Sequence, residues 1–345
     1  MAQASMIGLD IAKSVFQVHG EDDGGRVVVQ QRLRRSQVVA FFAGLAPARI
    51  GIEACGSAHY WGRELSALGH EVRLIPAAYV KPFVRRNKTD ARDAAAICTA
   101  LGRPDMRFVA IKSQAQQASR GLERSRDLLV RQHTQLMNSV RSQLAEFGII
   151  AAQGRRGFAA LAQAVGSGTA AIPPVLCEVL ALLVQQIERL AAAIALLERR
   201  IVAAARAHPA MRRLTGIPGV GPLSAHAIVT AIGEGKQFAC ARDFAAWCGL
   251  TQRVDQSADQ RRQRGISRQG DNAVRKLLVL GASAVLRQLR ASPERASPWQ
   301  GGILARRPVK VVAVAQAARN ARIAWAMLQS GESYRRSGAA AAIAA

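Results

Sequence analysis

The sequence predicts an α/β domain followed by a mainly helical region, and three observations carry this prediction. Residues 1–108 alternate short apolar, strand-like segments with helical ones. Residues 109–208 hold two long stretches with apolar side chains at helical spacing, which predict a helical, coiled-coil linker. Residues 209–330 are predicted to be mainly helical around a Gly- and Pro-rich turn, and the tail 331–345 is expected to be disordered.

The first domain begins with three strand-like segments and then alternates helices with strands. This β-β-β-α-β-α-β-α order is that of an RNase H-like fold, which holds two divalent metal ions for phosphoryl transfer. The predicted elements are a strand around Asp10, strands at Val15 to His19 and Val27 to Leu33, a helix from about Ser36 to Leu45, a strand ending at Glu53, a helix from Tyr60 to Leu68, a strand from Glu71 to Ile75 and a helix that carries Asp90.

Four acidic residues stand out in a chain that is otherwise strongly basic. Asp90 and Asp93 lie three positions apart on a predicted helix and share one face, where two like charges require a cation. Asp10 lies in an apolar strand, and Glu53 ends another at the edge where α/β proteins assemble their sites. We expect the four to converge on Mg²⁺ or Mn²⁺. The Asp90 and Asp93 pair alone also fits an ordinary helix start.

Two strings in this domain resemble a known family. They are NKTDARDA at residues 87–94 and the less specific GLDIAK at residues 8–13. Both are similar to the DEDD transposases of bacterial insertion sequences, the IS110 group, whose N-terminal domain is RuvC-like. The resemblance implies that Asp10, Glu53, Asp90 and Asp93 are the metal-binding DEDD set.

The second half of the chain carries further strings of the same family. Residues 214–225, LTGIPGVGPLSA, predict a turn that opens onto a helix from Leu223 to Ile232 and resemble a helix-hairpin-helix element. Backbone N–H groups at such a turn can hold a phosphate, although a plain tight turn fits the composition as well. FAAWCGL at 244–250 and GISRQGD at 265–271 resemble the C-terminal transposase domain of the family.

Residues 251–264 are polar and basic, and we expect them to form an exposed loop. In the family that this chain resembles, the loop carries a serine that attacks DNA, and counting back from the GIS string places Ser257 there. Gln256 and the pair Ala258-Asp259 depart from the family's SSGGK-like run. From the sequence alone a solvated loop serine is the simpler interpretation, and only the resemblance favours a nucleophile. Ser267 suits a cap of the following helix.

The charge of the chain indicates a polyanionic partner. It has 48 Lys and Arg against 23 Asp and Glu, a net charge of +25, which favours nucleic acid through counterion release. We find no signal peptide and no apolar run of membrane-spanning length, so we expect a cytoplasmic protein without a membrane partner. Five cysteines without a Cys-x-x-Cys pair argue against disulfides or a zinc site. The residues expected to contact nucleic acid are Lys13, Lys88, Arg92, Gly219, Gly221, Arg253, Arg261, Arg262, Arg264 and Arg268.

Two long helices are predicted in the linker, from Gln114 to Phe147 and from Pro174 to Ala207, packed as an antiparallel pair. The Gly- and Ser-rich stretch Gly154 to Thr169 would join them. Apolar faces of this length also suit packing against another protomer. Five arginines of the first helix would either follow a nucleic-acid backbone or be solvated; they are Arg120, Arg124, Arg126, Arg131 and Arg141.

These features predict a DNA transposase or site-specific recombinase. The resemblance implies Mg-dependent strand cleavage and exchange through a covalent phosphoserine at Ser257, with donor and target DNA chosen by a structured bridge RNA. It also implies a homo-oligomer, a dimer of dimers. Two alternatives stay open at this point: a metal-dependent Holliday-junction-type nuclease in which the acids activate water, and a non-enzymatic nucleic-acid-binding protein.

Overall fold

A computed structural model describes residues 3–84, 89–168, 172–257 and 260–335 of the chain, without the side chains at 256, 257, 260, 261 and 263. Lys88 and most of the predicted tail therefore lie outside the described residues. The chain divides into two compact units, Met1–Gln117 and Ala118–Ala345, here called the first and the second unit.

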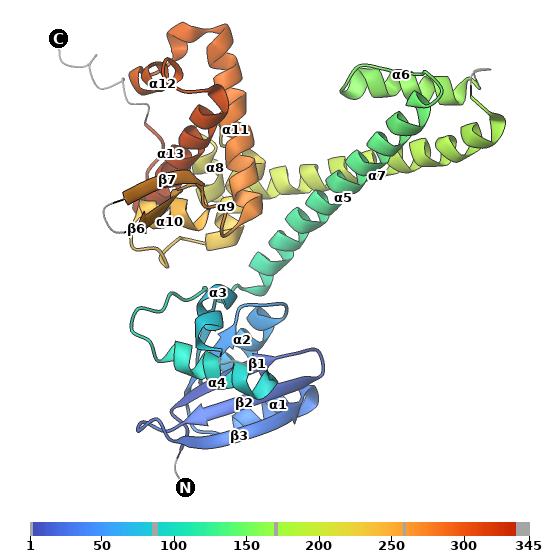
Figure 1. The fold of residues 1–345 in the computed structure, drawn as a ribbon. Coiled ribbons are helices and arrows are strands. Elements are labelled where there is room, and N and C mark those ends of the chain that lie inside the picture. The colour runs from blue at the N-terminus through green and yellow to red at the C-terminus, as the bar shows by residue number, and fades with distance from the viewer. Residues whose placement is uncertain (1–2, 85–88, 169–171, 258–259, 336–345) are drawn as a thin grey trace, which may run out of the picture. The chain divides into compact units, whose positions relative to one another are not determined.

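The first unit is built on a five-stranded sheet in the order β3-β2-β1-β4-β5 (Figure 1). Strand β2 is antiparallel to both of its neighbours, whereas β1, β4 and β5 run parallel. The predicted order of strands and helices is confirmed, with one short helix, α3, added. The elements are β1 (Met6–Ile11), β2 (Val15–Glu21), β3 (Val27–Arg34), α1 (Val38–Ala43), β4 (Arg49–Glu53), α2 (Ala58–Ala67), β5 (Glu71–Ile75), α3 (Ala77–Val80) and α4 (Asp90–Leu101).

Helices cover both faces of this sheet. On one face, α1 and α2 bury Phe42 and Trp61 against the strands, in a core that includes the fully buried Leu9 of β1 and Ile52 of β4. On the other face, α4 buries Ile97 and its apolar neighbours. Because side chains alternate along a strand, the residues next to Leu9 and Ile52 in sequence point toward α4. The sheet is thus the middle of three layers.

Glycine in the strands lets α4 lie close to the sheet. A Cβ added to Gly8 of β1 would lie 2.0 Å from the backbone oxygen of Ala94 and 2.5 Å from the nitrogen of Cys98, so a side chain has no room there. A Cβ added to Gly51 of β4 would lie 3.1 Å from a side-chain carbon of Ile97. Burial between α4 and the sheet raises the pKa of the Cys98 thiol to about 12.

The second unit begins within helix α5 (Gln114–Ala145) and continues through α6 (Arg155–Gly166) and α7 (Pro174–Ala207). In this unit α5 and α7 run antiparallel, as predicted, and a small core joins Val140 and Leu144 of α5 to Leu180 and Ile187 of α7. The remaining elements are α8 (Pro209–Leu214), α9 (Pro222–Ile232), α10 (Ala241–Trp247), β6 (Gln252–Ser257), β7 (Gln260–Ile266), α11 (Asn272–Ala291), α12 (Pro298–Leu304) and α13 (Val309–Ser330). Helices α8 to α11 and α13 share one apolar core around Phe244.

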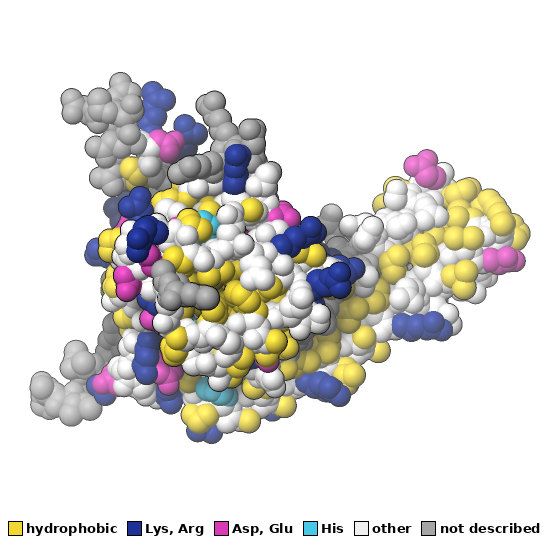
Figure 2. Space-filling view, turned by 90° about the horizontal axis from the view of Figure 1, so that it is seen from below, with side chains coloured by type: hydrophobic (Ala, Val, Ile, Leu, Met, Phe, Trp, Pro, Cys, Tyr) yellow, Lys and Arg dark blue, Asp and Glu magenta, His cyan; other side chains and the backbone are white. Residues whose placement is uncertain are grey.

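Two expectations about the linker were wrong. The Gly- and Ser-rich stretch is a helix, α6, because Phe158, Leu161 and Val165 recur at helical spacing and are buried between α5 and α7. An apolar run of membrane-spanning length does exist: α7 has such a window, of which 17% is buried. Its exposed apolar residues include Val175, Val179 and Leu182, and Figure 2 shows hydrophobic side chains along the α5 to α7 hairpin.

Replacing Gly8 by alanine should destabilise the first unit by about 2 kcal/mol, because the new methyl group overlaps the backbone of α4. Urea unfolding followed by circular dichroism measures the change. Gly56→Ala is the control, since no atom lies within 4 Å of the Cβ that it would add. Equal stability of Gly8→Ala and the control would show that α4 is not held at this distance.

Candidate active site

Three aspartates meet where α4 begins. Asp10 of β1 and Asp90 and Asp93 of α4 each offer a carboxylate oxygen, and these oxygens lie within 4.8 Å of one another. Asp93 is buried, Asp10 is half-buried and Asp90 is exposed. Asp10 follows Gly8 by two residues and so points to the same face of β1, toward α4. Because α4 packs closely on Gly8, the first turn of α4 lies next to Asp10.

Glu53 ends β4, the parallel neighbour of β1. It lies two residues after Gly51, so it shares with Asp10 the face that α4 covers. The two strands are in register up to Leu9 and Ile52, which makes Asp10 and Glu53 the next residues on adjacent strands. Glu53 is half-buried and is not among the three acids that meet within 4.8 Å.

Cys55 was not singled out from the sequence, yet it lies beside these acids. Burial, followed by the negative charges of Glu53 and Asp10, raises the pKa of the exposed Cys55 thiol. The charges of both carboxylates therefore act on this thiol. Asp10 and Glu53 lie near it at one edge of the sheet. Sequence spacing gave no sign of this neighbour, because cysteine so near a helix start has no distinctive pattern.

Two predicted nucleic-acid contacts lie near the acids. Arg92 is exposed on α4 between Asp90 and Asp93, and Lys13 is exposed just beyond the end of β1. Thr89 caps α4, and its hydroxyl accepts a hydrogen bond from the backbone nitrogen of Arg92 at 3.4 Å. The positive start of the helix is thus turned toward the site that the aspartates form.

Ser257 lies in the second unit, at the end of a two-stranded hairpin and not in a loop. β6 and β7 pair antiparallel, and Ser257 is opposite Gln260. The prediction of a loop was wrong, because backbone hydrogen bonds can form a solvated hairpin without apolar side chains. Arg253, Arg262 and Arg264 are exposed on it, and Arg264 forms an ion pair with Asp255 at 2.5 Å. Of Ser257 and Arg261 only the backbone is described.

The Gly-rich turn before α9 packs against two other helices. Gly219 has a φ of +87°, and a Cβ on Gly281 of α11 would lie 1.8 Å from the Gly219 oxygen. Asn320 of α13 donates a hydrogen bond to the Pro218 oxygen at 2.9 Å. Gly219 therefore has a packing role, whereas Gly221 is exposed just before the first turn of α9. Phosphate binding at this turn stays a prediction.

Comparison with known proteins decides the family. The transposase profile of the IS116/IS110/IS902 family matches residues 211–297, and a DEDD transposase profile of the IS110 group matches residues 7–149. A probable family 20 transposase of Pseudomonas aeruginosa is 47% identical over 96% of this chain and 98% of its own. The chain belongs to the IS116/IS110/IS902 transposase family.

Two other relatives agree with this membership. The transposase for insertion sequence element IS1328 of Yersinia enterocolitica is 36% identical over 96% of this chain and 98% of its own. The transposase for insertion sequence element IS1111A of Coxiella burnetii is also 36% identical, over 97% of this chain and 92% of its own. The chain is therefore an enzyme of DNA transposition, as the sequence predicted.

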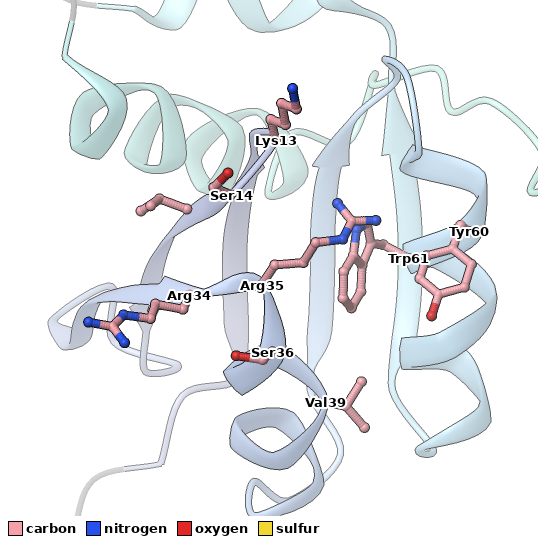
Figure 3. A pocket seen from close by; sticks show the side chains of 9 residues that line it. Lys13, Ser14, Arg34, Arg35, Ser36, Val39, Tyr60 and Trp61 are labelled. Carbon is pink, nitrogen blue, oxygen red and sulfur yellow. The ribbon is translucent and has the colours of Figure 1, made fainter.

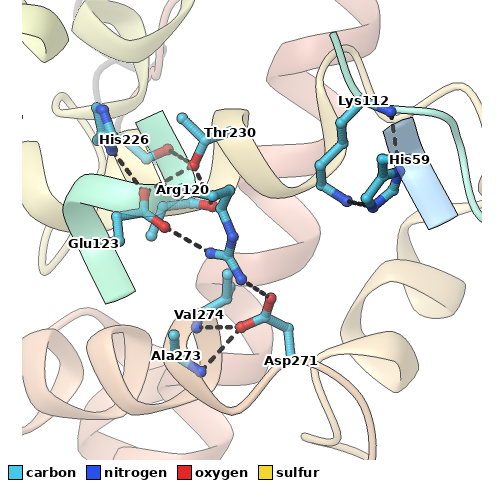
Figure 4. Close-up of polar contacts among 10 residues, drawn as sticks. His59, Lys112, Arg120, Glu123, His226, Thr230, Asp271, Ala273 and Val274 are labelled. Carbon is cyan, nitrogen blue, oxygen red and sulfur yellow. Dashed lines mark hydrogen bonds and ion pairs between the residues drawn. The ribbon is translucent and has the colours of Figure 1, made fainter. Parts of the chain in front are cut away.

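In this transposase a buried polar network joins three helices of the second unit (Figure 4). Glu123 of α5 accepts hydrogen bonds from Thr230 at 2.7 Å and from Arg120 at 2.6 Å, and it contacts Nδ1 of His226 at 2.6 Å. Arg120 also reaches Asp271 at 2.5 Å. The carboxylate of Asp271 caps α11 by accepting from the nitrogens of Ala273 and Val274. Sequence reasoning missed this network.

The network corrects two expectations. Arg120 neither follows a nucleic-acid backbone nor is solvated, since its side chain is 13% exposed and bound to two carboxylates. The cap of α11 is Asp271 and not Ser267. Of the other arginines, Arg126 pairs with Glu198, Arg131 pairs with Asp127, Arg141 donates to three backbone oxygens before α6, and Arg124 is exposed.

Replacing Glu123 by alanine should destabilise the second unit by about 3 kcal/mol, because it leaves Arg120, His226 and Thr230 without their shared acceptor. Urea unfolding gives the change in the free energy of unfolding. The matched control is Glu188→Ala, at an exposed position of α7, which should cost less than about 0.5 kcal/mol. Similar stability of the two variants would contradict a structural role for the network.

Proposed function

We propose that the chain is the recombinase of an insertion sequence, which cleaves and rejoins DNA strands through a covalent bond to Ser257. The observation that carries this proposal is the meeting of Asp10, Asp90 and Asp93 at one edge of the sheet in a transposase-family chain. Strand order β3-β2-β1-β4-β5 with β2 antiparallel supports an RNase H-like, RuvC-like first unit. We propose that the chain has an RNase H-like domain at 1–108, a helical linker at 109–208 and a C-terminal domain at 209–330.

The acids suit a hard divalent cation. Asp10, Asp90 and Asp93 present only oxygen donors, and their separation fits one ion or two neighbouring ions. Glu53 is proposed as the fourth ligand, since it shares their face of the sheet. Bound Mg²⁺ or Mn²⁺ would act as a Lewis acid on the phosphate oxygens.

Residues of both units would share the reaction. The acids of the first unit position the scissile phosphate, and the hydroxyl oxygen of Ser257 forms a bond to phosphorus while the bond to one deoxyribose oxygen breaks. The serine proton passes to a basic group at the site, and the released deoxyribose oxygen takes up a proton. A later attack by a deoxyribose hydroxyl on the phosphoserine reverses these steps onto a new strand. One phosphoester replaces another, so the exchange needs no ATP.

The basic hairpin and the turn before α9 would hold nucleic acid around this reaction. Arg253, Arg262 and Arg268 are exposed in the second unit, where they can neutralise phosphates. The net charge of +25 is large enough for donor DNA, target DNA and a structured guide RNA, which we propose as partners. Lys88 and Arg261 are part of the same proposal.

A second copy of the chain is proposed as the partner of α7. Val175, Val179 and Leu182 are exposed and spaced by four and three residues, so they form one apolar stripe on this helix. Such a stripe suits helix packing between protomers in a dimer, and two dimers would supply the composite sites of a tetramer. A protein that acts on bacterial DNA in this way works in the cytoplasm.

Mg²⁺ or Mn²⁺ should raise the melting temperature of the first unit, because binding to the folded state alone stabilises it, by about 2.7 kcal/mol at a hundred times the Kd. Asp10→Asn should abolish this rise, and Asp23→Asn, an exposed acid in the β2 to β3 turn, should retain it. Differential scanning fluorimetry with and without EDTA makes the measurement. A rise that persists in Asp10→Asn would remove Asp10 from the site.

Ser257→Ala should abolish the covalent protein–DNA adduct while binding stays unchanged, since it removes one oxygen and no charge. A substrate nicked near the cleavage position releases a short fragment and traps the adduct, which then migrates with labelled DNA after denaturation. Ser267→Ala is the matched control in the same basic segment. Cleavage by Ser257→Ala at the wild-type rate, with free DNA ends, would instead favour the nuclease that activates water.

A further inference from the structure

A pocket of about 700 Å³ opens beside the end of β1 on the face of the sheet that α1 and α2 cover (Figure 3). Its lining combines cations with aromatic rings and hydroxyls, and none of the lining residues is acidic. The lining residues are Lys13, Ser14, Val15, Arg34, Arg35, Ser36, Val39, Tyr60 and Trp61. This composition differs from the acid cluster on the opposite face of the same strand.

Arg35 is the cation that reaches into the pocket. Its backbone nitrogen donates to the Ser14 oxygen at 2.9 Å, which fixes its position. The guanidinium group lies 5.2 Å from the centre of the Trp61 ring and 5.9 Å from that of Phe16. In Figure 3 it extends toward Trp61, whereas the Lys13 and Arg34 side chains point away from this pair. No ion pair with another described residue neutralises any of these three cations.

Trp61 supplies a second, independent sign of a ligand. Its side chain is 2% exposed, and its indole N–H has no hydrogen-bond acceptor among the described residues. Buried donors are almost always satisfied, because an unmet one costs about 1–3 kcal/mol. The Trp61 ring lies in the pocket wall beside the Arg35 guanidinium, so an anion that Arg35 attracts would lie next to this unsatisfied N–H.

Tyr60 gives the pocket a platform for a base. The residue is 40% exposed, and its ring packs edge-on against Trp61, with ring centres 5.1 Å apart. Phenol rings at the rim of basic grooves are typical partners for unpaired bases, which stack on them without regard to sequence. A phosphate at Arg35 and Trp61 with its base on Tyr60 would engage the cation, the unsatisfied N–H and the exposed ring at once.

We propose that this pocket binds one unpaired nucleotide of a nucleic-acid strand, with the phosphate held by Arg35 and the Trp61 N–H and the base stacked on Tyr60. The pocket and the acid cluster lie on opposite faces of the sheet at the same end of β1. A strand whose phosphate lies at Asp10 can continue past Lys13 into the pocket. An unpaired nucleotide would thus be held close to the acids.

The test measures binding of full-length protein to short fluorescent oligo(dT), and to a duplex of equal length, by anisotropy in EDTA. EDTA excludes any contribution of a metal at the acids, so the outcome is independent of the proposed cleavage chemistry. Tyr60→Leu should weaken oligo(dT) binding about tenfold, the usual loss of one stacked base, with an unchanged salt dependence. Arg35→Gln should weaken it and also lower the slope of log Kd against log salt by about 0.7.

Matched controls come from the same unit. Tyr79 is exposed to a similar degree, 44%, outside this pocket, and Arg73 is an exposed arginine already paired with Glu71. Tyr79→Leu and Arg73→Gln should bind oligo(dT) within twofold of the wild type. Trp61→Phe removes the N–H together with part of the buried ring system, so it should weaken oligo(dT) binding about threefold, and the melting temperature, which the lost packing lowers, shows whether the variant is folded at the assay temperature.

The proposal fails if the wild type binds neither oligo(dT) nor oligo(U), if Tyr60→Leu binds both within twofold of the wild type, or if the control variants lose as much affinity. It also fails if duplex binding falls as far as oligo(dT) binding, which would indicate a general phosphate contact. The same measurement with fluorescent oligo(U) distinguishes RNA from DNA as the bound strand. A loss in Tyr60→Leu confined to oligo(dT) assigns the pocket to DNA, and one confined to oligo(U) assigns it to RNA.

Discussion

The candidate site depends on one steric constraint, the contact between α4 and the glycines of β1 and β4. Aspartate has a single methylene group, so aspartates on a strand and on a helix can meet only if the two backbones are close. A side chain at position 8 would lie 2.0 Å from the Ala94 oxygen and would push the helix away from Asp10. Glu53, on the neighbouring strand, has one methylene more to reach toward the same place. The absence of side chains at Gly8 and Gly51 is therefore what brings the acids together.

The sequence predicted most of the first unit because each of its strands and helices has its own apolar period. The failures elsewhere concern segments in which composition was a poor guide to the contacts that form. α6 looks like a loop by its Gly and Ser content, although Phe158, Leu161 and Val165 recur at helical spacing and are buried. Strands β6 and β7 carry few apolar residues, so pairing alone defines them. The partner of Arg120 is Asp271, 151 positions away, and no local pattern announces such a pair.

Of the four acids expected to converge, the sequence allowed the meeting of three to be predicted. Asp90 and Asp93 share a helix face by spacing, and α4 brings Asp10 to them. The sequence did not reveal Cys55, whose thiol lies near Glu53 and Asp10, nor the position of Arg35 beside Trp61, in a short 3₁₀ turn after β3. Ser257 and the acids lie in different units.

Electrostatics explains why an acid cluster that takes up nucleic acid needs cations beside it. Carboxylates repel a phosphodiester, so a cluster of them attracts nucleic acid only when cations neutralise the acids and hold the flanking phosphates. The sheet keeps the two apart, with Asp10 on the face that α4 covers and the pocket of Arg35 and Trp61 on the face that α1 and α2 cover. Cations with no acidic partner can exchange counterions for phosphates, whereas Arg120 and Arg126, already paired within the second unit, stabilise the fold instead. The net charge of +25 is therefore divided between structure and binding, and the unpaired arginines are the ones available to a polyanion.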